Sequence, residues 1–141
     1  AKYIIGTDGE KMSKSKSNII DIFLDDKKLR KQIMKIQTQS LSIEESKNPD
    51  HCNVFKLFKI IAPEDKVKKL HSRYTKGGIG YGEAKELLYN EILSRFSVNR
   101  EKFSELTNNR DKVEELLLKG AIKARKQAQN VLKRVRSRVG Y

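Results

Sequence analysis

The sequence is short of three things: cysteine, long apolar runs and acidic side chains. Its single cysteine, Cys52, has no partner for an internal disulfide, and no segment resembles a signal peptide, so we expect a reducing compartment, the cytoplasm. No apolar run approaches the ~18 residues that cross a bilayer, and the cationic positions are spread over several segments instead of one aromatic-anchored helix, so no membrane partner is predicted. Only 18 acidic residues stand against 31 Lys and Arg, and the net charge of +13 predicts a polyanionic partner, nucleic acid or nucleotide first.

The length and the composition together favour a small helical protein. A chain of 141 residues fits one ordinary domain with an appended segment, and it excludes a complete two-domain enzyme. Hydrophobic residues make up 37% of the chain, which is enough for a core and excludes disorder throughout. Charged residues make up 35%, which favours helices with solvated faces over a buried sheet.

The first twenty residues differ from the rest of the chain. Residues 3–5 are typical of a strand, residues 6–9 of a glycine-containing turn, and residues 10–18 of a polar loop. A strand needs neighbouring strands for its backbone groups, and this one begins the chain without a methionine. We therefore expect a piece of a larger protein, in which residues 1–20 end a preceding domain and residues 21–141 form a helical domain.

From Asp25 onward, apolar residues recur at helical spacing. The pattern and its turn signals predict helices over residues 25–36, 54–61, 63–75, 84–96, 99–106 and 111–138. Asn53 and Asn99 are placed to cap two of these helices, and residues 38–50 are predicted to be a surface connection. Helices joined by short turns indicate an all-α helical bundle with a short N-terminal strand and loop appended.

The most specific local pattern is a run of lysines and serines: Lys11-Met12-Ser13-Lys14-Ser15. The flanking Gly6 and Gly9 free the backbone, so that two ammonium groups, serine hydroxyls and backbone N–H groups can bind phosphate oxygens. This pattern suits a triphosphate. On physical grounds alone, a solvated linker remains the competing interpretation.

Three separated segments resemble one known family. The run at 11–15 matches letter for letter the KMSKS signature of class I aminoacyl-tRNA synthetases. Residues 6–10 (GTDGE) resemble the lead-in of the tryptophanyl branch, residues 78–85 (GIGYGEAK) resemble the start of one of its helices, and residues 120–124 (GAIKA) resemble its final helix. The resemblance covers nearly the whole chain, in the family's order.

The resemblance implies the C-terminal part of such an enzyme, with residues 1–20 left from its Rossmann catalytic domain and the bundle as its anticodon-binding domain. The family's His-Ile-Gly-His signature and its amino-acid pocket are absent from this sequence, so we expect the chain alone to be inactive. The implied activity of the full-length enzyme is ATP-dependent activation of tryptophan and its transfer to tRNA, with Mg²⁺ accompanying ATP. A homodimer is implied as well.

In that family the loop closes over ATP, which gives its residues their implied roles. Lys11 and Lys14 would contact the phosphates and stabilise charge on the departing pyrophosphate as catalytic residues, with Lys14 the stronger candidate. Met12, Ser13 and Ser15 would shape the loop and complete the ATP-binding set. The tyrosyl branch, which shares this chemistry, stays open because the deciding pocket is absent.

The predicted last helix has one apolar and one basic face. At ~100° per residue, the apolar positions fall together, and the opposite side carries Lys119, Lys123, Lys126, Lys133 and Arg134. We predict that the apolar face packs and that the basic face binds tRNA. A merely solvated face, with cations suited to the helix C-terminus, is the alternative.

Other interpretations also stay open. A stand-alone RNA-binding helical module, with a chance KMSKS string, and a protein-binding helical adaptor are both compatible with the pattern. The glycine-rich residues 77–82 are predicted to form a turn with a helix cap, because they lack the ending of a phosphate-binding loop. His51, Cys52 and His71 have no metal-ligand spacing, so no bound metal is predicted.

Overall fold

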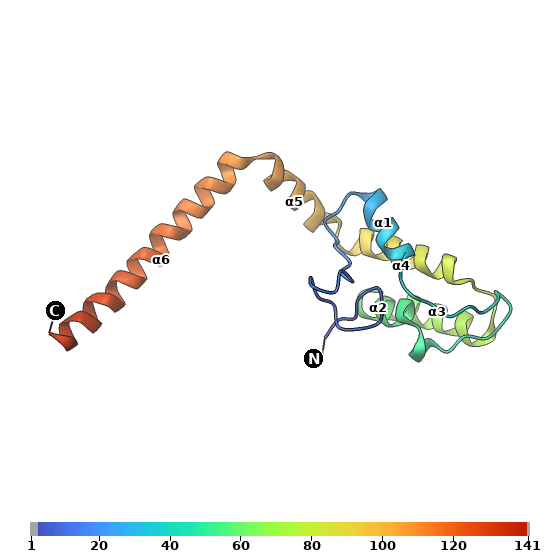
Figure 1. The fold of residues 1–141 in the computed structure, drawn as a ribbon. Helices are drawn as coiled ribbons and strands as arrows, with labels where there is room; N and C mark the ends of the chain where they lie inside the picture. Colours follow the sequence, from blue (N-terminus) through green and yellow to red (C-terminus); the bar gives the residue numbers. More distant parts are fainter. Residues whose placement is uncertain (1–2, 141) are drawn as a thin grey trace. The chain divides into compact units, whose positions relative to one another are not determined.

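A computed structural model describes residues 3–140, and every regular element in that range is helical (Figure 1). The elements are α1 (Asp26–Met34), the 3-10 turn η1 (Pro49–His51), α2 (Asn53–Ile61), α3 (Glu64–Lys76), α4 (Tyr81–Arg95), α5 (Ser97–Asn108) and α6 (Arg110–Val139). The all-α prediction is therefore confirmed. The chain divides into two compact units, Ala1–Arg100 and Glu101–Tyr141.

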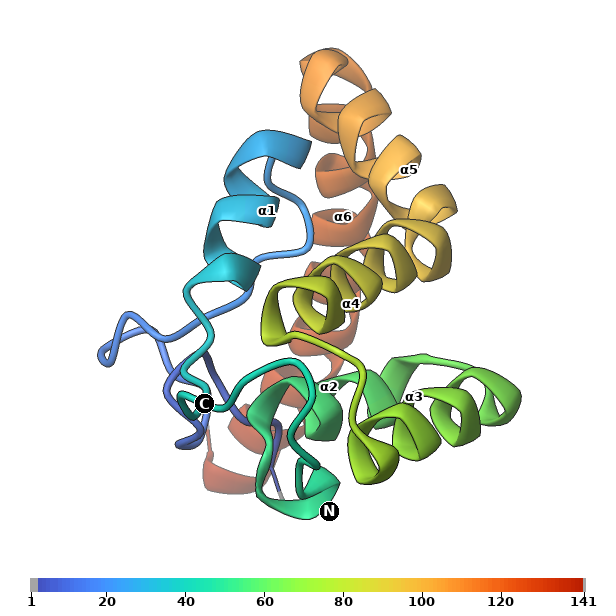
Figure 2. The same ribbon diagram turned by 90° about the vertical axis from the view of Figure 1, so that its right-hand side faces the viewer.

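In the first unit, α4 packs against both α1 and α2, and α2 packs against α3 (Figure 2). The predicted apolar stripes fill the space between these helices. Leu29 and Ile33 of α1 and Leu88 of α4 are completely buried, and Ile92 is 5% exposed. Apolar side chains at spacings of three and four residues share one helix face, which explains why these helices formed where the periodicity predicted.

Ion pairs join the helices at the edge of this core. Glu91 of α4 is buried, and its carboxylate accepts a hydrogen bond from Lys66 of α3 at 2.6 Å. Arg100 of α5 donates to Asp26 of α1 at 2.5 Å and also to the backbone carbonyl of Ile22. Because a buried carboxylate needs a compensating partner, Lys66 is part of the fold rather than a free surface charge.

The connection over residues 38–50 is not only a surface segment, because Lys47 within it is 2% exposed. Its ammonium group donates to the backbone carbonyls of Ser42 at 2.5 Å and Glu45 at 3.0 Å. It also lies 5.5 Å from the centre of the Tyr81 ring, within the range of a cation–π interaction. The carbonyl oxygens around Lys47 compensate its charge, so that it can be buried. The Ser-, Lys- and Glu-rich sequence of residues 38–50 does not reveal this burial.

The glycine-rich turn before α4 closes onto that connection. Gly78 donates its N–H to the carbonyl of Ile43 at 2.8 Å. Gly77 has φ of 81°, and a Cβ there would lie 2.1 Å from the carbonyl oxygen of Glu44. The turn predicted at 77–82 is therefore confirmed over residues 77–80, since α4 already begins at Tyr81. The glycine at 77 is required by both conformation and close approach.

Two predicted helix caps are wrong. Helix α2 begins one residue early, so that Cys52 is its N-cap without a side-chain hydrogen bond, and Asn53 instead donates to the carbonyl of Gln37 at 3.3 Å. Asn99 lies inside α5, because that helix already begins at Ser97. A residue within a helix cannot supply a cap, so side-chain type alone did not locate these two starts.

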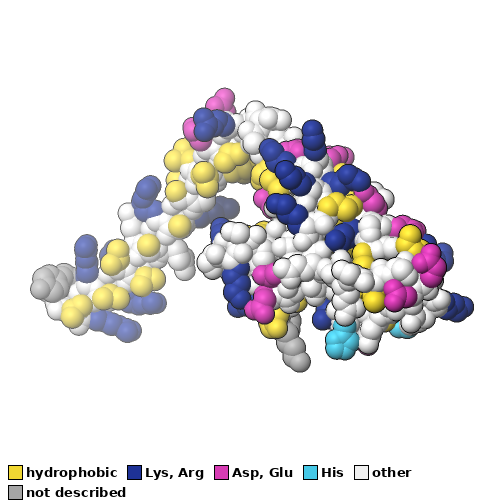
Figure 3. Space-filling view, turned by 45° about the vertical axis from the view of Figure 1, so that its right-hand side comes forward, with side chains coloured by type: hydrophobic (Ala, Val, Ile, Leu, Met, Phe, Trp, Pro, Cys, Tyr) yellow, Lys and Arg dark blue, Asp and Glu magenta, His cyan; other side chains and the backbone are white. Residues whose placement is uncertain are grey.

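The second unit contains α6, in which no residue is buried. The predicted packing of its apolar face is not seen within the second unit, where Leu117 is 68% exposed and Val135 is 50% exposed. Hydrophobic and basic side chains both lie open along this helix (Figure 3). Asn109 caps its first turn by accepting from the N–H of Lys112 at 3.2 Å. No helix within residues 3–140 is both long and apolar enough to cross a bilayer.

Candidate functional site

The KMSKS run lies on a tight return of the chain, not on a strand. Gly6 donates its N–H to the carbonyl of Glu10 at 2.8 Å, and Met12 donates to the carbonyl of Ile4 at 2.9 Å. Ile5 and Lys11 form an isolated antiparallel bridge. The predicted strand at residues 3–5 is therefore not confirmed. A strand needs a longer run of partner backbone, and within residues 3–140 this segment pairs only with its own return.

One buried side chain, that of Asn18, connects the base of the loop. Its Oδ1 accepts from the backbone N–H of Ser13 at 2.8 Å, and its Nδ2 donates to the carbonyl of Lys11 at 3.1 Å. The same Nδ2 donates to the Asp8 carboxylate at 2.8 Å. At 2% exposure, Asn18 is one of the few buried polar residues of the first unit. It fixes the backbone on both sides of Met12.

The structure explains the residue type at three positions of the lead-in GTDGE. A Cβ on Gly6 would lie 2.4 Å from the backbone oxygen of Asn18, so only glycine permits this approach. The Asp8 carboxylate also accepts from the N–H of Glu10 at 3.0 Å, and the hydrogen bond from Asn18 lowers the pKa of Asp8. Gly9 has φ of 85°, which a side chain would strain.

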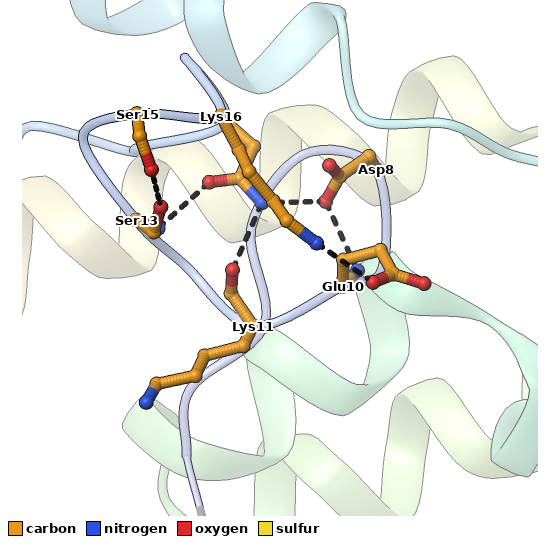
Figure 4. Close-up of polar contacts among 7 residues, drawn as sticks. Asp8, Glu10, Lys11, Ser13, Ser15 and Lys16 are labelled. Atoms are coloured by element: carbon orange, nitrogen blue, oxygen red, sulfur yellow. Dashed lines mark hydrogen bonds and ion pairs between the residues drawn. The ribbon is translucent and has the colours of Figure 1, made fainter.

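The three lysines of this segment differ in how they are paired, and Figure 4 shows two of them, Lys11 and Lys16. Lys16 donates to the Glu10 carboxylate at 3.0 Å, and this contact raises the pKa of Lys16. The Lys11 side chain points away from the network (Figure 4). Lys11 and Lys14 are exposed, and neither ammonium group forms a hydrogen bond or ion pair within residues 3–140. These two charges are available to an anion.

The serines of the motif contact each other and not the lysines. The hydroxyls of Ser13 and Ser15 lie 2.9 Å apart in a hydrogen bond, and the N–H of Ser17 donates to the carbonyl of Lys14 at 3.2 Å. Ser17 has φ of 52°, the left-handed region, as it completes this turn. The loop therefore offers hydroxyls and two unpaired ammonium groups on one short stretch, which is suitable chemistry for phosphate.

Met12 faces the apolar interior beside the loop. It lines a cavity of about 260 Å³ together with residues before and after the loop, residues of α2 and α4, and the residue that follows α4: Ile4, Ile20, Ile22, Leu57, Ile60, Ile61, Leu88, Ile92 and Phe96. Met12 therefore serves as an apolar anchor between the two lysines of the motif. Sequence reasoning placed Met12 in the loop but did not identify this contact.

The basic face of α6 has the predicted residues, and one of them is already paired. Lys119 forms an ion pair with Glu115 one turn earlier. Lys123, Lys126, Lys133 and Arg134 are exposed and have no ion-pair partner within residues 3–140. The sequence from 119 to 138 contains no acidic residue, which explains why its cations lack local partners.

Close to the start of α6, Glu105 forms ion pairs with two lysines. It pairs with Lys102 at 2.7 Å and with Lys112, and these two hydrogen bonds lower the pKa of Glu105 to about 2. Phe103, Leu106, Val113 and Leu117 line an open groove of about 680 Å³ in the same unit, together with Thr107, Arg110 and Glu114. Sequence reasoning identified neither feature.

The candidate metal residues are not brought together as a site. The Cys52 thiol is buried, with its Sγ 3.4 Å from the Tyr74 hydroxyl. Burial raises the pKa of Tyr74 well above its usual range, so this hydroxyl stays protonated. Residues 3–140 contain no group of three His, Cys, Asp or Glu side chains placed to hold a metal ion.

Comparison with known proteins gives a consistent set of relatives. The tryptophan–tRNA ligase of Campylobacter jejuni is 43% identical over 137 residues, which cover 97% of this chain and 43% of that protein. The tryptophan–tRNA ligase of Fusobacterium nucleatum is 44% identical over 96% of this chain and 41% of its own length. This chain thus spans less than half the length of the curated relatives it matches.

A solved structure matches the whole chain. The crystal structure of tryptophanyl-tRNA synthetase from Campylobacter jejuni, complexed with ADP and tryptophan, aligns with a TM-score of 0.93 at 42% identity, covering 100% of this chain and 44% of that one. The model of the family described as tRNA synthetases class I (W and Y) matches residues 1–97. The resemblance carried by the three motifs is confirmed, and the chain belongs to the class I tRNA synthetase family that includes the W and Y enzymes.

Proposed function

We propose that this chain is the C-terminal part of a tryptophan–tRNA ligase, in which it supplies the KMSKS loop and a tRNA-binding helical domain. The complete enzyme activates tryptophan with ATP, accompanied by Mg²⁺, and transfers it to tRNA. The relatives support this assignment, because both are tryptophan–tRNA ligases that match nearly all of the chain. The implied cytoplasmic homodimer is part of the same proposal.

One observation carries the catalytic part of the proposal: two of the three loop lysines are unpaired. Lys16 is paired with Glu10, whereas the ammonium groups of Lys11 and Lys14 have no partner within residues 3–140. As the tryptophan carboxylate attacks the α-phosphate of ATP, negative charge moves onto the departing pyrophosphate. Lys11 and Lys14 stabilise that charge, and since it grows toward the transition state, their contacts raise the rate more than they tighten binding.

The test is alanine substitution at each lysine in the complete enzyme, followed by single-turnover measurement of adenylate formation. Lys11→Ala and Lys14→Ala should lower the rate by about 10²- to 10³-fold, the usual cost of losing one positioned charge or donor at a reacting centre. Tryptophan affinity should be nearly unchanged. Lys16→Ala is the matched control, since it removes a lysine of the same loop that is already paired with Glu10.

Two results would contradict this part of the proposal. One is a normal rate in the Lys14→Ala enzyme. The other is an equal loss in all three variants, which would mean that the loop needs only its overall charge. Pyrophosphate exchange driven by tyrosine instead of tryptophan would move the assignment to the tyrosyl branch.

The tRNA-binding part rests on the basic face of α6, where four of the five cations have no ion-pair partner within residues 3–140. Lysines act as point charges on phosphates, whereas the guanidinium fork of arginine suits bidentate recognition of bases. Because four of the five proposed contacts are lysines (Lys119, Lys123, Lys126 and Lys133, beside Arg134), we infer that this face binds the tRNA backbone. It therefore contributes affinity and leaves discrimination between tRNAs to other residues.

Salt dependence tests this inference in the complete enzyme. Lys123→Ala and Lys126→Ala should each reduce the slope of log K against log salt by roughly 0.7 to 0.9, for cognate and non-cognate tRNA alike. Lys119→Ala should change the slope less, because Glu115 already pairs with that lysine. An unchanged slope in the Lys123→Ala/Lys126→Ala enzyme would show that the face is merely solvated.

A further inference from the structure

We propose that Asn18 is the positioning residue of the KMSKS loop, because its side chain fixes the backbone that carries Lys11 and Lys14. This inference rests on the proposed function, since it concerns how Lys11 and Lys14 reach ATP. Asn18 lies outside the five-residue motif and has no expected contact with substrate. Its side chain instead contacts the backbone of the motif at Lys11 and Ser13.

The chemistry of the contacts requires an amide at this position. Ser13 offers an N–H, which needs an acceptor, and Lys11 and Asp8 offer oxygens, which need donors. A carboxylate at position 18 has acceptors only, and an alkyl side chain has neither. Because Asn18 is 2% exposed, water does not replace these bonds easily when they are lost.

The amide is itself held in place from two directions. The backbone carbonyl of Asn18 accepts from the N–H of Thr7 at 2.9 Å, and its side chain packs against Gly6, where a Cβ would lie only 2.5 Å from Cγ. Asp8 is fixed in turn by the N–H of Glu10 at 3.0 Å. Residues 6–10 therefore hold the Asn18 side chain in place, and Asn18 in turn holds the backbone of the motif.

The anchored region ends at Ser13, and this boundary separates two parts of the loop. Lys11 projects from backbone that Asn18 holds directly, and Lys14 follows one residue beyond the anchored N–H of Ser13. Residues 14–17 are exposed. They are held by the hydrogen bond from the Ser17 N–H to the Lys14 carbonyl and by two exposed contacts, Ser15 with Ser13 and Lys16 with Glu10. An enzyme without Asn18 would therefore keep both lysines, but it would lose the side-chain hydrogen bonds that hold the backbone positioning them.

The experiment measures adenylate formation in single turnovers by the complete enzyme carrying Asn18→Ala. Misplacing a catalytic group by about 1 Å can cost about 10²-fold in rate, and we expect a fall of that order with tryptophan affinity unchanged. Asp8→Ala, which removes an acceptor of the amide and of the Glu10 N–H but leaves Asn18 in place, should show a smaller fall in the same direction. Asp8→Asn should recover part of that loss, because its amide oxygen still accepts from Asn18.

A double-mutant cycle separates positioning from general damage. If Asn18 acts through the lysines, Asn18→Ala should lower the rate much less in an enzyme that already carries Lys11→Ala and Lys14→Ala. Equal falls in the two backgrounds would overturn the inference, as would a normal rate in Asn18→Ala beside a slow Lys14→Ala. A normal rate in Lys14→Ala would instead overturn the proposed function, so the two failures are distinguishable.

Discussion

Replacing the buried Lys47 by methionine should destabilise the first unit. Methionine matches the length and apolar stem of lysine, so the change removes the ammonium group while leaving little cavity. The lost group donates to the carbonyls of Ser42 at 2.5 Å and Glu45 at 3.0 Å. A third contact, to the carbonyl of Ile43 at 3.5 Å, matters less because that oxygen also accepts from Gly78 at 2.8 Å.

The magnitude follows from those two hydrogen bonds. A hydrogen bond to a charged group contributes about 1.5–3 kcal/mol, so two of them set an upper limit near twice that value. Two effects offset the loss: methionine carries no charge that must be desolvated, and Ser42 and Glu45 are exposed residues whose carbonyls water can approach. We therefore expect a net loss of about 2 kcal/mol, equivalent to a fall in Tm of about 8–16 °C for a unit of this size.

Urea unfolding followed by tyrosine fluorescence measures this loss, because the sequence contains no tryptophan to mask the signal of Tyr74 and Tyr81. Hydrogen exchange adds a local readout at the N–H of Lys47, which donates to the carbonyl of Tyr74 at 2.6 Å. Lys56→Met on the exposed side of α2 is the matched control and should stay within about 0.5 kcal/mol. A loss below that limit in Lys47→Met would refute the assigned role.

Three further outcomes test the fold and the site. Leu88→Ala should cost about 3 kcal/mol in urea unfolding, since it enlarges a cavity that Leu88 already lines, whereas Leu117→Ala on the exposed face of α6 should cost little. Glu105 should titrate near the pKa of about 2 in an NMR titration, and Lys112→Ala should raise that pKa toward the ordinary value of 4.5. Because this pKa is lowered, the pairing with Lys102 and Lys112 is complete at neutral pH and is lost as the pH falls toward 2. The chain alone should catalyse no tryptophan-dependent pyrophosphate exchange.

Periodicity predicted the parts of the fold whose cause is local. The faces of α1 and α4 followed from apolar residues at helical spacing, and the long helix α6 from an unbroken pattern that the structure extends by one residue at each end. The burial of Leu29 and Leu88 follows because each helix of the first unit finds a neighbour within the chain. The same reasoning does not identify what covers the apolar face of α6, because a pattern shows that a face is apolar and not which partner covers it, and the second unit supplies no such partner.

The sequence did not predict the burial of two polar side chains, Asn18 and Lys47. Asn18 follows a lysine- and serine-rich run, and Lys47 lies in a similar one, yet both are 2% exposed. Composition assigns such residues to solvent, because their burial is favourable only with partners that the chain brings together through turns. One signal was available: Gly6 and Gly77 stand where the backbone of another segment approaches too closely for a Cβ.

The pairing of charges separates the cations that maintain the fold from those that remain available. In the first unit, basic side chains link one helix to another through the pairs Arg30–Glu86, Lys66–Glu91 and Arg100–Asp26. A cation held in this way cannot bind phosphate without giving up its partner. Lys11 and Lys14 have no such partner within residues 3–140, nor have the cations of residues 120–138, where no acidic residue occurs. The net charge of +13 predicts only the sign of a partner. The unpaired cations of the motif and of α6 remain available to such a partner, and we therefore expect ATP phosphates at the loop and the tRNA backbone at α6.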